Sequence, residues 1–356
     1  MTTRTFPTAA ASVAPERGSD PAQRGSDPVA PTMLAVVQDR YGPADEVLRV
    51  ERMPVPTPQH GEVVVRVHAA SVYVGALVFI EGEPMIARMA TGLRKPKTRV
   101  PGTDIAGTVV AIGDGVTQLR VGDEVFGWCS GAFAEFACAA ADQFVTVPSN
   151  LSFEQSAAVG VSATAALQLL RDRVQPGQRV LINGASGGLG SYAVQIAAAL
   201  GAEVTGVCGP ANVETVRELG AAHVIDYTRN DFTTDGNRYD FILDNVANHS
   251  LSQTRRALTD DGILQSNNGT SGGRWFGTMG TVIKTAIVSR FTRRQAGPSI
   301  KFPTREDLIV LKDLIEAGKV TPLVGRTYPL SQAGRAVRHV GEGHARGTVV
   351  LTVDVS

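Results

Sequence analysis

Two patterns of hydrophobic and polar positions follow one another along the chain. From residue 33 to about residue 127, short apolar runs of β type alternate with glycine and proline. The strands predicted in this part are 33–37, 47–51, 62–69, 107–112 and 124–127. Strands at this spacing favour a compact, partly open β-barrel over a parallel sheet.

The second pattern begins near residue 153 and alternates helix with strand. Alanine and leucine at helical spacing predict a helix over 153–172. Strands are then predicted at 179–183, 203–208, 223–226, 241–245 and 262–266, and helices at 190–200, 212–219, 251–258 and 305–317. This alternation indicates a parallel sheet with helices on both faces. The stretch 323–353 returns to β character, and its strand 348–353 is expected to rejoin the first domain.

The chain is thus predicted to be an α/β protein in which a β-rich domain is interrupted by a dinucleotide-type domain. The predicted domains are 32–153 with 321–356, and 154–320. Residues 1–31 are rich in small and polar residues and repeat the sequence RGSDP at 17–21 and 24–28. Such a segment buries too little apolar surface to offset its ordering entropy, so it is predicted to be a disordered tail.

Composition and charge exclude several classes of protein. Lysine plus arginine and aspartate plus glutamate both number 34, so no net field attracts nucleic acid or an anionic membrane. Three cysteines cannot build a disulfide framework, and the start does not resemble a secretory signal. Glycine or charge interrupts every apolar stretch before the ~20 residues that a membrane helix needs. A soluble cytoplasmic protein is therefore expected.

A glycine-rich turn stands between a predicted strand and a predicted helix. Such a turn can hold a pyrophosphate on the helix N-terminus, although a lone glycine-rich turn is also a common tight connection. Gly187 and Gly190 match the second and third glycines of the dinucleotide fingerprint, while Ala185 takes the place of the first. The residues predicted to bind the dinucleotide are Ala185, Ser186, Gly187, Gly188, Leu189 and Gly190.

The end of the next strand bears on the choice of dinucleotide. This strand ends at Cys208, where NAD-preferring folds place Asp or Glu on the ribose hydroxyls. No carboxylate stands at this strand end to repel a 2′-phosphate, and Asn212 and Tyr227 can donate hydrogen bonds to it. NADPH is therefore the predicted cofactor. NADH stays open, because no arginine stands beside Cys208 and Tyr227 could simply pack in a pocket that accepts both.

Several motifs together resemble the quinone oxidoreductase branch of the medium-chain dehydrogenase/reductase superfamily over 33–353. They are VPGTDIAGTV at 100–109, GDEVFG at 122–127, GAFAEF at 131–136, LINGASGG at 181–188 and GHARGTVVL at 343–351. The resemblance implies a GroES-like catalytic domain, a Rossmann domain with a doubly wound parallel sheet, and a cleft between them for NAD(P)H. Relatives of this fold are commonly dimers, so a homodimer is expected by analogy.

Zinc ligands are missing from this sequence at the positions that match those of zinc-dependent members of the superfamily. The matching positions hold Tyr73, Thr103-Asp104 and the neighbourhood of Val159–Gly160. Three cysteines are also too few for the four-cysteine structural zinc lobe, and the six histidines show no metal-ligand spacing. No metal is therefore predicted.

Tyr73 is the predicted catalytic residue. Zinc-free relatives usually carry Asn at this position and Asp shortly after it, whereas this chain has Tyr73 and then Gly75-Ala76. A protonated phenol there can donate a hydrogen bond to a carbonyl or enolate oxygen. The alternative is that Tyr73 only packs over the nicotinamide or fills the vacant zinc pocket.

Further cofactor contacts are predicted around the carboxyl ends of the parallel strands, where ligands bind in this fold. By resemblance, Thr164 is placed near the nicotinamide, although it could be an ordinary capping residue. The other residues predicted to contact the cofactor are Asn245, Val246, Asn267, Asn268, Gly269 and Arg346. The apolar stretch 275–291 is interpreted either as a lid over the substrate or as a core or dimer helix.

The predicted function is reduction of a quinone or of an activated C=C bond (an enone or enoyl compound) by hydride from NADPH. Without a Lewis acid, the enzyme needs an acceptor that is itself reactive, together with good positioning and a hydrogen-bond donor. Three alternatives stay open: a dedicated biosynthetic enoyl reductase, a zinc-free carbonyl or alcohol dehydrogenase, and a non-catalytic NADPH-binding sensor or scaffold.

Overall fold

The structure of the protein is a computed structural model that describes residues 31–267, 302–343 and 345–353. Most of the predicted tail, Asn268, Gly269 and the segment 275–291 lie outside these residues. Within the described ranges, no helix is long and apolar enough to cross a membrane.

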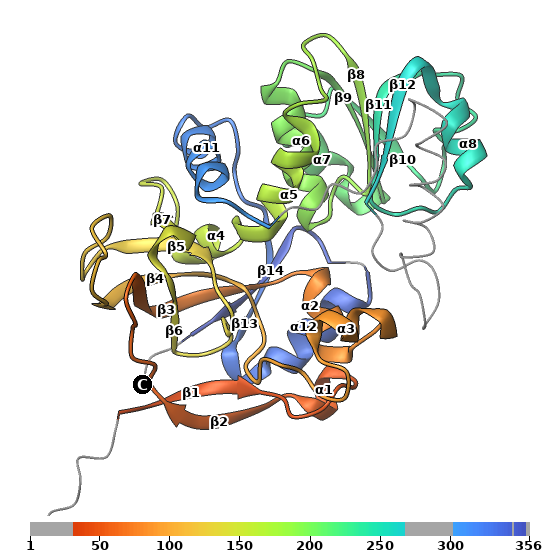
Figure 1. Cartoon of the computed structure of the whole chain (residues 1–356). Coiled ribbons are helices and arrows are strands. Elements are labelled where there is room, and N and C mark those ends of the chain that lie inside the picture. Colours follow the sequence, from red (N-terminus) through yellow and green to blue (C-terminus); the bar gives the residue numbers. More distant parts are fainter. Residues whose placement is uncertain (1–30, 268–301, 344, 354–356) are drawn as a thin grey trace, which may run out of the picture. The chain divides into compact units, whose positions relative to one another are not determined.

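The β-rich part is built on a seven-stranded sheet (Figure 1). Its strands are β3 (Glu62–Val72), β4 (Asp104–Ile112), β5 (Glu124–Trp128), β6 (Phe136–Ala140), β7 (Phe144–Thr146), β13 (Val324–Pro329) and β14 (Thr348–Thr352). The order is β13-β14-β3-β4-β5-β7, with β6 paired to β3, and only the β13–β14 pair is parallel. The end of the chain rejoins the first strands, as predicted, because β14 pairs with β3.

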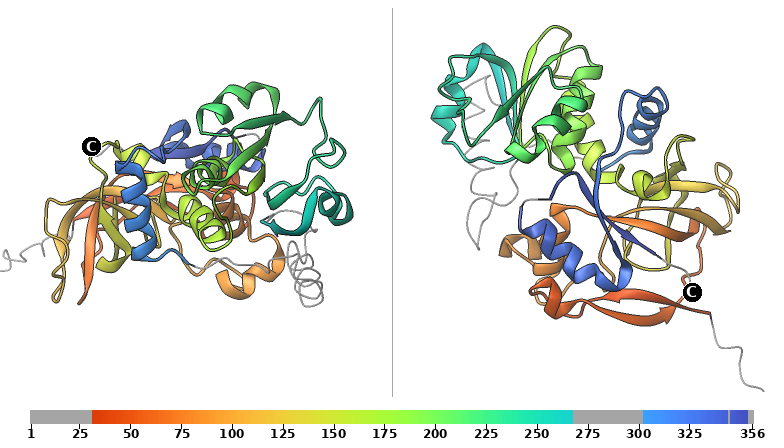
Figure 2. Two further views of the ribbon diagram at one scale, coloured as in Figure 1. Left: turned by 90° about the horizontal axis from the view of Figure 1, so that it is seen from above. Right: turned by 180° about the vertical axis from the view of Figure 1, so that it is seen from behind.

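A separate antiparallel pair and four helices complete this part. The pair is β1 (Thr32–Val37) with β2 (Arg49–Pro54), and the helices are α1 (Ala44–Val47), α2 (Val74–Glu81), α3 (Arg88–Thr91) and α12 (Ala333–Gly341). Helix α12 packs against β14 and α2, and the view from behind in Figure 2 shows it in blue beside β13 and β14. The β character predicted for 323–353 is therefore wrong over 333–341, which form α12.

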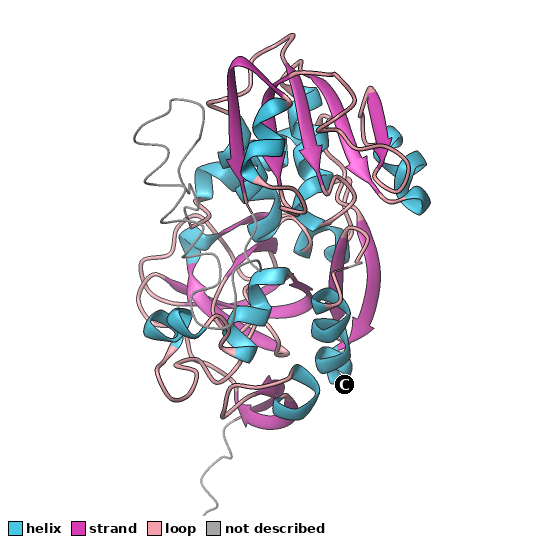
Figure 3. Cartoon of the chain, turned by 90° about the vertical axis from the view of Figure 1, so that its right-hand side faces the viewer, coloured by secondary structure: helices cyan, strands magenta, loops and turns pink. Residues whose placement is uncertain are grey.

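The second part contains a parallel sheet of five strands with the order β10-β9-β8-β11-β12. Its strands are β8 (Arg179–Asn183), β9 (Glu203–Cys208), β10 (His223–Asp226), β11 (Tyr239–Asp244) and β12 (Leu258–Ser266). Among the described residues, the helices around this sheet include α6 (Gly188–Ala199), α7 (Val213–Glu218), α8 (Leu251–Arg256) and α11 (Arg305–Glu316). Figure 3 shows the five strands as a row of arrows with helices alongside them. The strand order reverses beside β8, which places a ligand crevice at its carboxyl end.

The predicted helix 153–172 is in fact two helices, α4 (Phe153–Ala157) and α5 (Gly160–Leu170). Ser152 caps α4, because its hydroxyl accepts a hydrogen bond from the amide of Gln155. The break leaves the amide of Val161 free to donate to Asp104 Oδ2 at 3.0 Å instead of to a helix carbonyl. A helix that looks continuous in sequence therefore stops where it meets a buried carboxylate.

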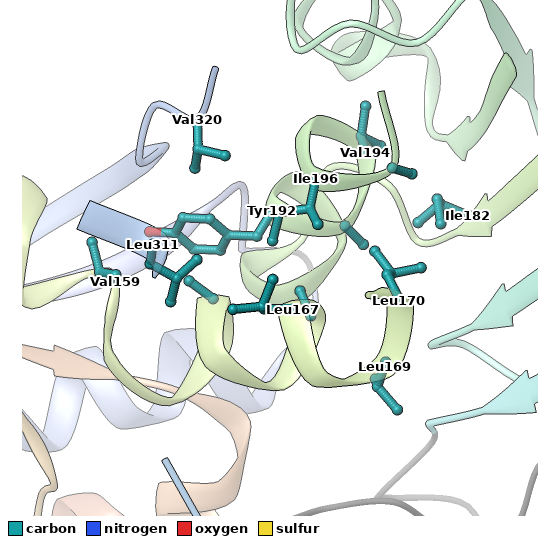
Figure 4. Packing of buried hydrophobic residues seen from close by; sticks show 14 of the residues in the cluster. Val159, Leu167, Leu169, Leu170, Ile182, Tyr192, Val194, Ile196, Leu311 and Val320 are labelled. Atoms are coloured by element: carbon teal, nitrogen blue, oxygen red, sulfur yellow. The ribbon is translucent and has the colours of Figure 1, made fainter. Parts of the chain in front are cut away.

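The largest hydrophobic core lies around α5 and α6. Figure 4 shows Tyr192 of α6 packed among Leu167 of α5, Ile196 of α6 and Leu311 of α11. Tyr192 is fully buried and its hydroxyl donates to the carbonyl of Ala158 at 3.0 Å. This bond satisfies the polar end of a buried aromatic side chain and ties α6 to the break between α4 and α5.

Candidate functional site

The glycine turn is a tight connection between β8 and α6. The amides of Gly184 and Ala185 donate to the carbonyl of Val207 at 3.1 and 2.9 Å, and the amide of Gly187 donates to the carbonyl of Gly184 at 3.2 Å. A Cβ atom on Gly190 would lie 2.0 Å from the carbonyl oxygen of Gly184, so only glycine allows this approach. The turn thus holds the N-terminus of α6 directly above the end of β8.

The C-terminal strand meets the same turn. The amide of Gly347 donates to the carbonyl of Ser186 at 2.8 Å, and Gly187 and Gly347 form a parallel bridge. The predicted residue Arg346 therefore lies next to the glycine turn, and its side chain is exposed. A Cβ atom on Gly188 would face Gly347, Thr348 and Ser162 at 3.5 Å or more.

Cys208, Asn212 and Tyr227 come together around Gly209, as the cofactor prediction requires. The amide of Asn212 donates to the carbonyl of Gly209 at 3.0 Å. The amide of Tyr227 donates to the carbonyl of Cys208 at 3.2 Å. A Cβ atom on Gly209 would lie 3.3 Å from the Tyr227 hydroxyl, and Tyr227 is 56% exposed. The phenol is therefore at the surface of this edge rather than in the core.

The expectation that no carboxylate lies at this edge is wrong, because Asp226 pairs with Cys208 across β10 and β9. The amide and hydroxyl of Thr228 donate to Asp226 Oδ1 at 2.9 and 2.8 Å and hold the pKa of this carboxyl below its usual range. Arg229 lies 3.6 Å from the same carboxylate and its side chain is 82% exposed. Asp226 could not be recognised from the sequence, because it is a neighbour of Cys208 only across the sheet.

An amide cluster occupies the carboxyl ends of β8, β11 and β12. Asn267 Nδ2 donates to Asn245 Oδ1 at 3.1 Å, and Asn245 Nδ2 donates to the carbonyl of Asn183 at 3.1 Å. Val246 reaches the glycine turn, since a Cβ atom on Gly184 would lie 2.9 Å from Val246 Cγ2. Three of the predicted residues, Asn245, Val246 and Asn267, thus lie around the turn.

Asp244, which sequence reasoning missed, organises this cluster. Its buried Oδ1 accepts hydrogen bonds from Asn183 Nδ2 and from the amides of Val246 and Ala247 at 2.8, 3.1 and 2.9 Å. Ala247 has a φ of 54°, in the left-handed region that non-glycine residues rarely adopt. The carboxylate therefore holds the loop after β11 in a conformation that it would otherwise avoid.

Thr164 is placed differently from the other predicted cofactor residues. Its side chain is buried, and its hydroxyl donates to the carbonyl of Gly160 at 2.8 Å, one turn earlier in α5. Its hydroxyl is thus paired within α5, and the residue does not cap the helix, because the N-cap of α5 is Val159.

Tyr73 lies next to a buried network centred on Asp104, at the start of β4. Ser71 Oγ and the amide of Val161 donate to Asp104 Oδ2, both at 3.0 Å, and Thr103 Oγ1 donates to Asp104 Oδ1 at 3.3 Å. Burial raises the pKa of Tyr73 to about 12, with the nearby Asp104 carboxylate adding to the shift and the Thr103 side chain opposing it. The phenol is therefore protonated throughout the neutral range.

The two departures from the family pattern at this place belong together. A Cβ atom on Gly75 would lie 2.2 Å from Tyr73 Cε2 and 3.0 Å from Cδ2 and Cζ, which is too close to the edge of the aromatic ring. The ring of Tyr73 thus needs the space that a side chain at position 75 would occupy. A tyrosine at 73 and a glycine at 75 are one structural feature.

A small cavity opens beside Tyr73. Its volume is about 160 Å³, and its lining includes Tyr73, Thr103, Phe79 and Gln38. Most of the exposed wall is apolar and comes from α2, Ala90 and the segment 96–101, while Lys97, Thr98 and Ser130 add polar groups to the lining. A compact ring of small-molecule size fits such a space, with the phenol of Tyr73 at its edge.

Burial raises the pKa of Asp104 to about 6, against the hydrogen bonds from Val161 and Ser71 that lower it. The folded protein thus holds this proton more tightly than the unfolded chain, so the stability that protonation contributes is lost as the pH rises from about 4 to about 6. The loss is about 3 kcal/mol. Asp104→Asn keeps the shape but removes the ionisation. Urea titrations measure the unfolding free energy of both proteins at each pH. As the pH rises from about 4 to about 7, the wild type is expected to lose about 3 kcal/mol that the variant does not lose, so the difference between them changes by that amount in favour of the variant. Parallel pH profiles for the two proteins would contradict the shift.

Comparison with known proteins decides the family. Residues 59–149 match the family described as alcohol dehydrogenase GroES-like domain, and residues 219–351 match the one described as zinc-binding dehydrogenase. The mitochondrial NAD(P)H oxidoreductase RTN4IP1 of Mus musculus is 31% identical, over 90% of this chain and 89% of that protein. The quinone oxidoreductase of Mus musculus is also 31% identical, over 86% of this chain and 94% of that protein. The chain belongs to the quinone oxidoreductase-like branch of the medium-chain dehydrogenase/reductase superfamily.

Solved structures agree with this assignment. The quinone oxidoreductase from Coxiella burnetii superposes with a TM-score of 0.79 at 28% identity, covering 91% of this chain and 100% of that one. The Escherichia coli quinone oxidoreductase complexed with NADPH gives a TM-score of 0.75 at 26% identity, covering 90% and 100%. The predicted fold class, a GroES-like part with a Rossmann part, is confirmed. This chain is an oxidoreductase of that superfamily, while the predicted domain limits stay predictions.

The residues present do not fit the zinc ion that one of the matched family descriptions implies. At the positions that match the zinc ligands, Asp104 is the only carboxylate, and its oxygens already accept three hydrogen bonds. Gly160 lies against this carboxyl, where a Cβ atom would come within 2.2 Å of Asp104 Cγ. Among the described residues, no three His, Cys, Asp or Glu side chains gather as a ligand set.

The residues at the glycine turn, in contrast, do fit the dinucleotide that the fold implies. Gly187 is the N-cap of α6, and a Cβ atom on it would meet only the carbonyl oxygen of Gly184, at 3.5 Å. The turn therefore leaves open the space through which a pyrophosphate would approach the helix N-terminus. The residues of this dehydrogenase/reductase fit a dinucleotide and do not fit a catalytic zinc ion.

Proposed function

We propose that this member of the superfamily is a zinc-independent, NADPH-dependent reductase of quinones or of activated C=C bonds. The observation that carries the proposal is the position of Tyr73, a protonated phenol on an apolar cavity whose polar neighbours offer no metal site. The names of the relatives, which include NAD(P)H oxidoreductase and quinone oxidoreductase, support a nicotinamide cofactor and a small-molecule acceptor.

Each part of the site has a role in this proposal. The amides at the start of α6 hold the pyrophosphate. Asn212, Tyr227 and Arg229 receive the 2′-phosphate, and Arg229, which lies 3.6 Å from the Asp226 carboxylate, offsets the negative charge of that group. NADPH, when bound, supplies the hydride. The apolar cavity positions the acceptor and excludes water. The Tyr73 hydroxyl donates a hydrogen bond to the carbonyl oxygen, where negative charge develops.

Burial and the nearby carboxylate keep Tyr73 in its donor state. Burial and the charge of Asp104 both oppose loss of the Tyr73 proton, and they outweigh the opposite effect of the Thr103 side chain. The α-carbon of a reduced enone then takes its proton from a side chain or from water. A quinone demands less of the protein, because its own reactivity supplies most of the driving force.

The assay that tests the proposal follows loss of NADPH or NADH with a panel of quinones, enones, enoyl thioesters and simple ketones. We expect turnover on quinones or enones, a preference for NADPH of about tenfold or more, equal to about 1.4 kcal/mol, and full activity after treatment with a chelator. Stoichiometric zinc that is needed for turnover would overturn the proposal. Turnover of ketones alone would indicate a carbonyl reductase, turnover of enoyl thioesters alone a dedicated enoyl reductase, and NADPH binding without turnover a sensor.

The predicted homodimer and the predicted cytoplasmic location stay predictions. Gel filtration with light scattering on the same preparation measures the first. The names of two relatives place those proteins in the chloroplast envelope and the mitochondrion.

A further inference from the structure

A chain of hydroxyl groups connects the cavity beside Tyr73 to the buried carboxyl of Asp104. Thr103 Oγ1 lies 3.3 Å from Asp104 Oδ1, and the Thr103 side chain also forms a hydrogen bond with the Tyr73 phenol. Tyr73 and Thr103 both line the cavity, whereas Asp104 is 1% exposed. The Thr103 hydroxyl therefore lies between the proposed donor and a carboxyl that solvent does not reach.

The two oxygens of the Asp104 carboxyl differ in their partners. Oδ2 accepts hydrogen bonds from Ser71 Oγ and from the amide of Val161, both at 3.0 Å. Because an amide N–H can only donate, Oδ2 has to keep a lone pair toward it. When the carboxyl takes up a proton, that proton is therefore placed on Oδ1, the oxygen that faces the Thr103 hydroxyl.

The direction of the chain depends on this proton, because each hydroxyl group has one hydrogen to donate. When Asp104 is ionised, Thr103 donates to Oδ1, and the Thr103 oxygen accepts the hydrogen of the Tyr73 phenol. When Asp104 is protonated, it donates to Thr103, and Thr103 donates to the phenol oxygen. Only the second arrangement leaves the hydrogen of the Tyr73 phenol free for a molecule in the cavity.

We propose that Thr103 is a positioning residue, which turns the Tyr73 hydrogen toward the acceptor when Asp104 is protonated and away from it when Asp104 is ionised. This inference rests on the proposed function, because the donor that it concerns is the phenol of the same site. Reduction of an enone needs that donor, so ionisation of Asp104 slows it. Reduction of a quinone, which needs less stabilisation from the protein, is affected less.

Asp104 is the group of this network that changes charge at moderate pH, because burial raises its pKa to about 6. Three other titratable groups lie close enough to interact with its charge, namely Tyr73, Cys129 after β5 and Tyr192 of α6. Burial raises the pKa of each of these groups, so all three stay neutral while Asp104 ionises. The donor is therefore expected to be available below about pH 6 and to be lost as the pH rises above it.

The test measures the rate constant of enone reduction by stopped-flow oxidation of NADPH at several pH values. Between about pH 5 and about pH 8, the wild-type rate is expected to fall by about tenfold or more, toward the rate of Tyr73→Phe. In Asp104→Asn, the side-chain oxygen accepts from Val161 and the Nδ2 group donates to Thr103 at every pH. The enone rate of this variant is expected to stay high over the whole range.

Substitutions of Thr103 test the chain itself. Thr103→Val removes the hydroxyl at nearly constant size and is expected to abolish the fall with pH, whereas Thr103→Ser is expected to restore it. Thr254→Val is the matched control, since Thr254 is a buried threonine of α8 outside the cavity lining, and it is expected to follow the wild-type profile. A fall caused by another group, such as His68 of β3, whose pKa burial lowers, would persist in Asp104→Asn and Thr103→Val and would overturn the inference.

An infrared measurement reads the direction of the Tyr73 hydroxyl without an acceptor molecule. The C–O stretching band of this phenol, taken as the difference between the wild type and Tyr73→Phe, has different frequencies when the phenol donates and when it only accepts. The band is expected to shift between about pH 5 and about pH 8 in the wild type and not in Asp104→Asn. An unshifted wild-type band overturns the inference. If the band shifts but no acceptor is reduced at any pH, the proposed function fails while the direction of the chain is supported.

Discussion

Gly190→Ala is expected to weaken NADPH binding by about 100-fold or more, equal to about 3 kcal/mol. The added methyl group would lie 2.0 Å from the carbonyl oxygen of Gly184 and 3.0 Å from Ala185 Cα. Both are backbone atoms of the turn, so α6 has to move away from β8. The amides at the start of α6 then no longer converge on the pyrophosphate. Titration of NADPH fluorescence measures the dissociation constant.

Gly334→Ala is the control for this substitution. Gly334 lies in α12, where an added Cβ has no neighbour closer than 3.2 Å and where alanine is the better helix former. This variant is expected to bind NADPH as the wild type does. Circular dichroism has to show that Gly190→Ala is folded. A folded Gly190→Ala protein with the dissociation constant of the wild type would show that the turn does not hold the dinucleotide.

The parallel sheet could be predicted closely from the sequence. The predicted strands 179–183, 203–208 and 223–226 coincide with β8, β9 and β10. Strands β8 and β9 are buried along most of their length and are bounded by glycines, so an apolar run and its end define each of them. Strand β10 is a partly exposed edge strand that was found from its short apolar run alone. The glycine turn was found for the same reason, because its function depends on residues that are consecutive in sequence.

Some helices of the β-rich part were missed for two different physical reasons. Helix α2 has the sequence VGALVFIE, which is apolar on nearly all sides and carries no helical periodicity. Helix α12 did offer a signal, since its buried residues Ala333, Ala336, Val337 and Val340 follow helical spacing. The two glycines within it and the surrounding β segments outweighed that signal in the sequence analysis.

The candidate site could be predicted only where its residues are close in sequence or known from the family. Asp104 meets Ser71, Gly160 and Val161 through folding alone, and nothing in the local sequence marks it as buried. The charge at the Cys208 edge was misjudged because Asp226 is adjacent across the sheet and not along the chain.

Tyr73 and Gly75 show how a departure from a family pattern acquires meaning in three dimensions. Taken one at a time, the departures from the family pattern at positions 73 and 75 weaken the case for carrying the family's catalytic role over to this chain. Read together, they show a ring that needs the space a side chain at position 75 would fill, beside a cavity and a buried carboxylate. Under the proposed function, the phenol of Tyr73 is the hydrogen-bond donor at this place.

Tyr73→Phe is expected to lower kcat for an enone by about 100-fold, because a donor aimed at a developing oxyanion contributes about 3 kcal/mol. The loss for a quinone is expected to be below about tenfold, since a quinone needs less stabilisation from the protein. The NADPH dissociation constant is expected to stay unchanged. Because the pKa of Tyr73 is about 12, the enone rate is not expected to fall through ionisation of this group between about pH 6 and pH 9. Stopped-flow oxidation of NADPH measures each rate.

Tyr239→Phe is the matched control, because it removes the hydroxyl of another buried tyrosine, at the start of β11 and outside the cavity. It is expected to leave both rates as in the wild type. If Tyr73→Phe lowers the enone and quinone rates equally, the hydroxyl contributes to packing or to acceptor positioning and not to charge at the oxygen. If it changes neither rate, Tyr73 has no donor role, and the proton and charge of the reaction have to be handled by the cofactor and water alone.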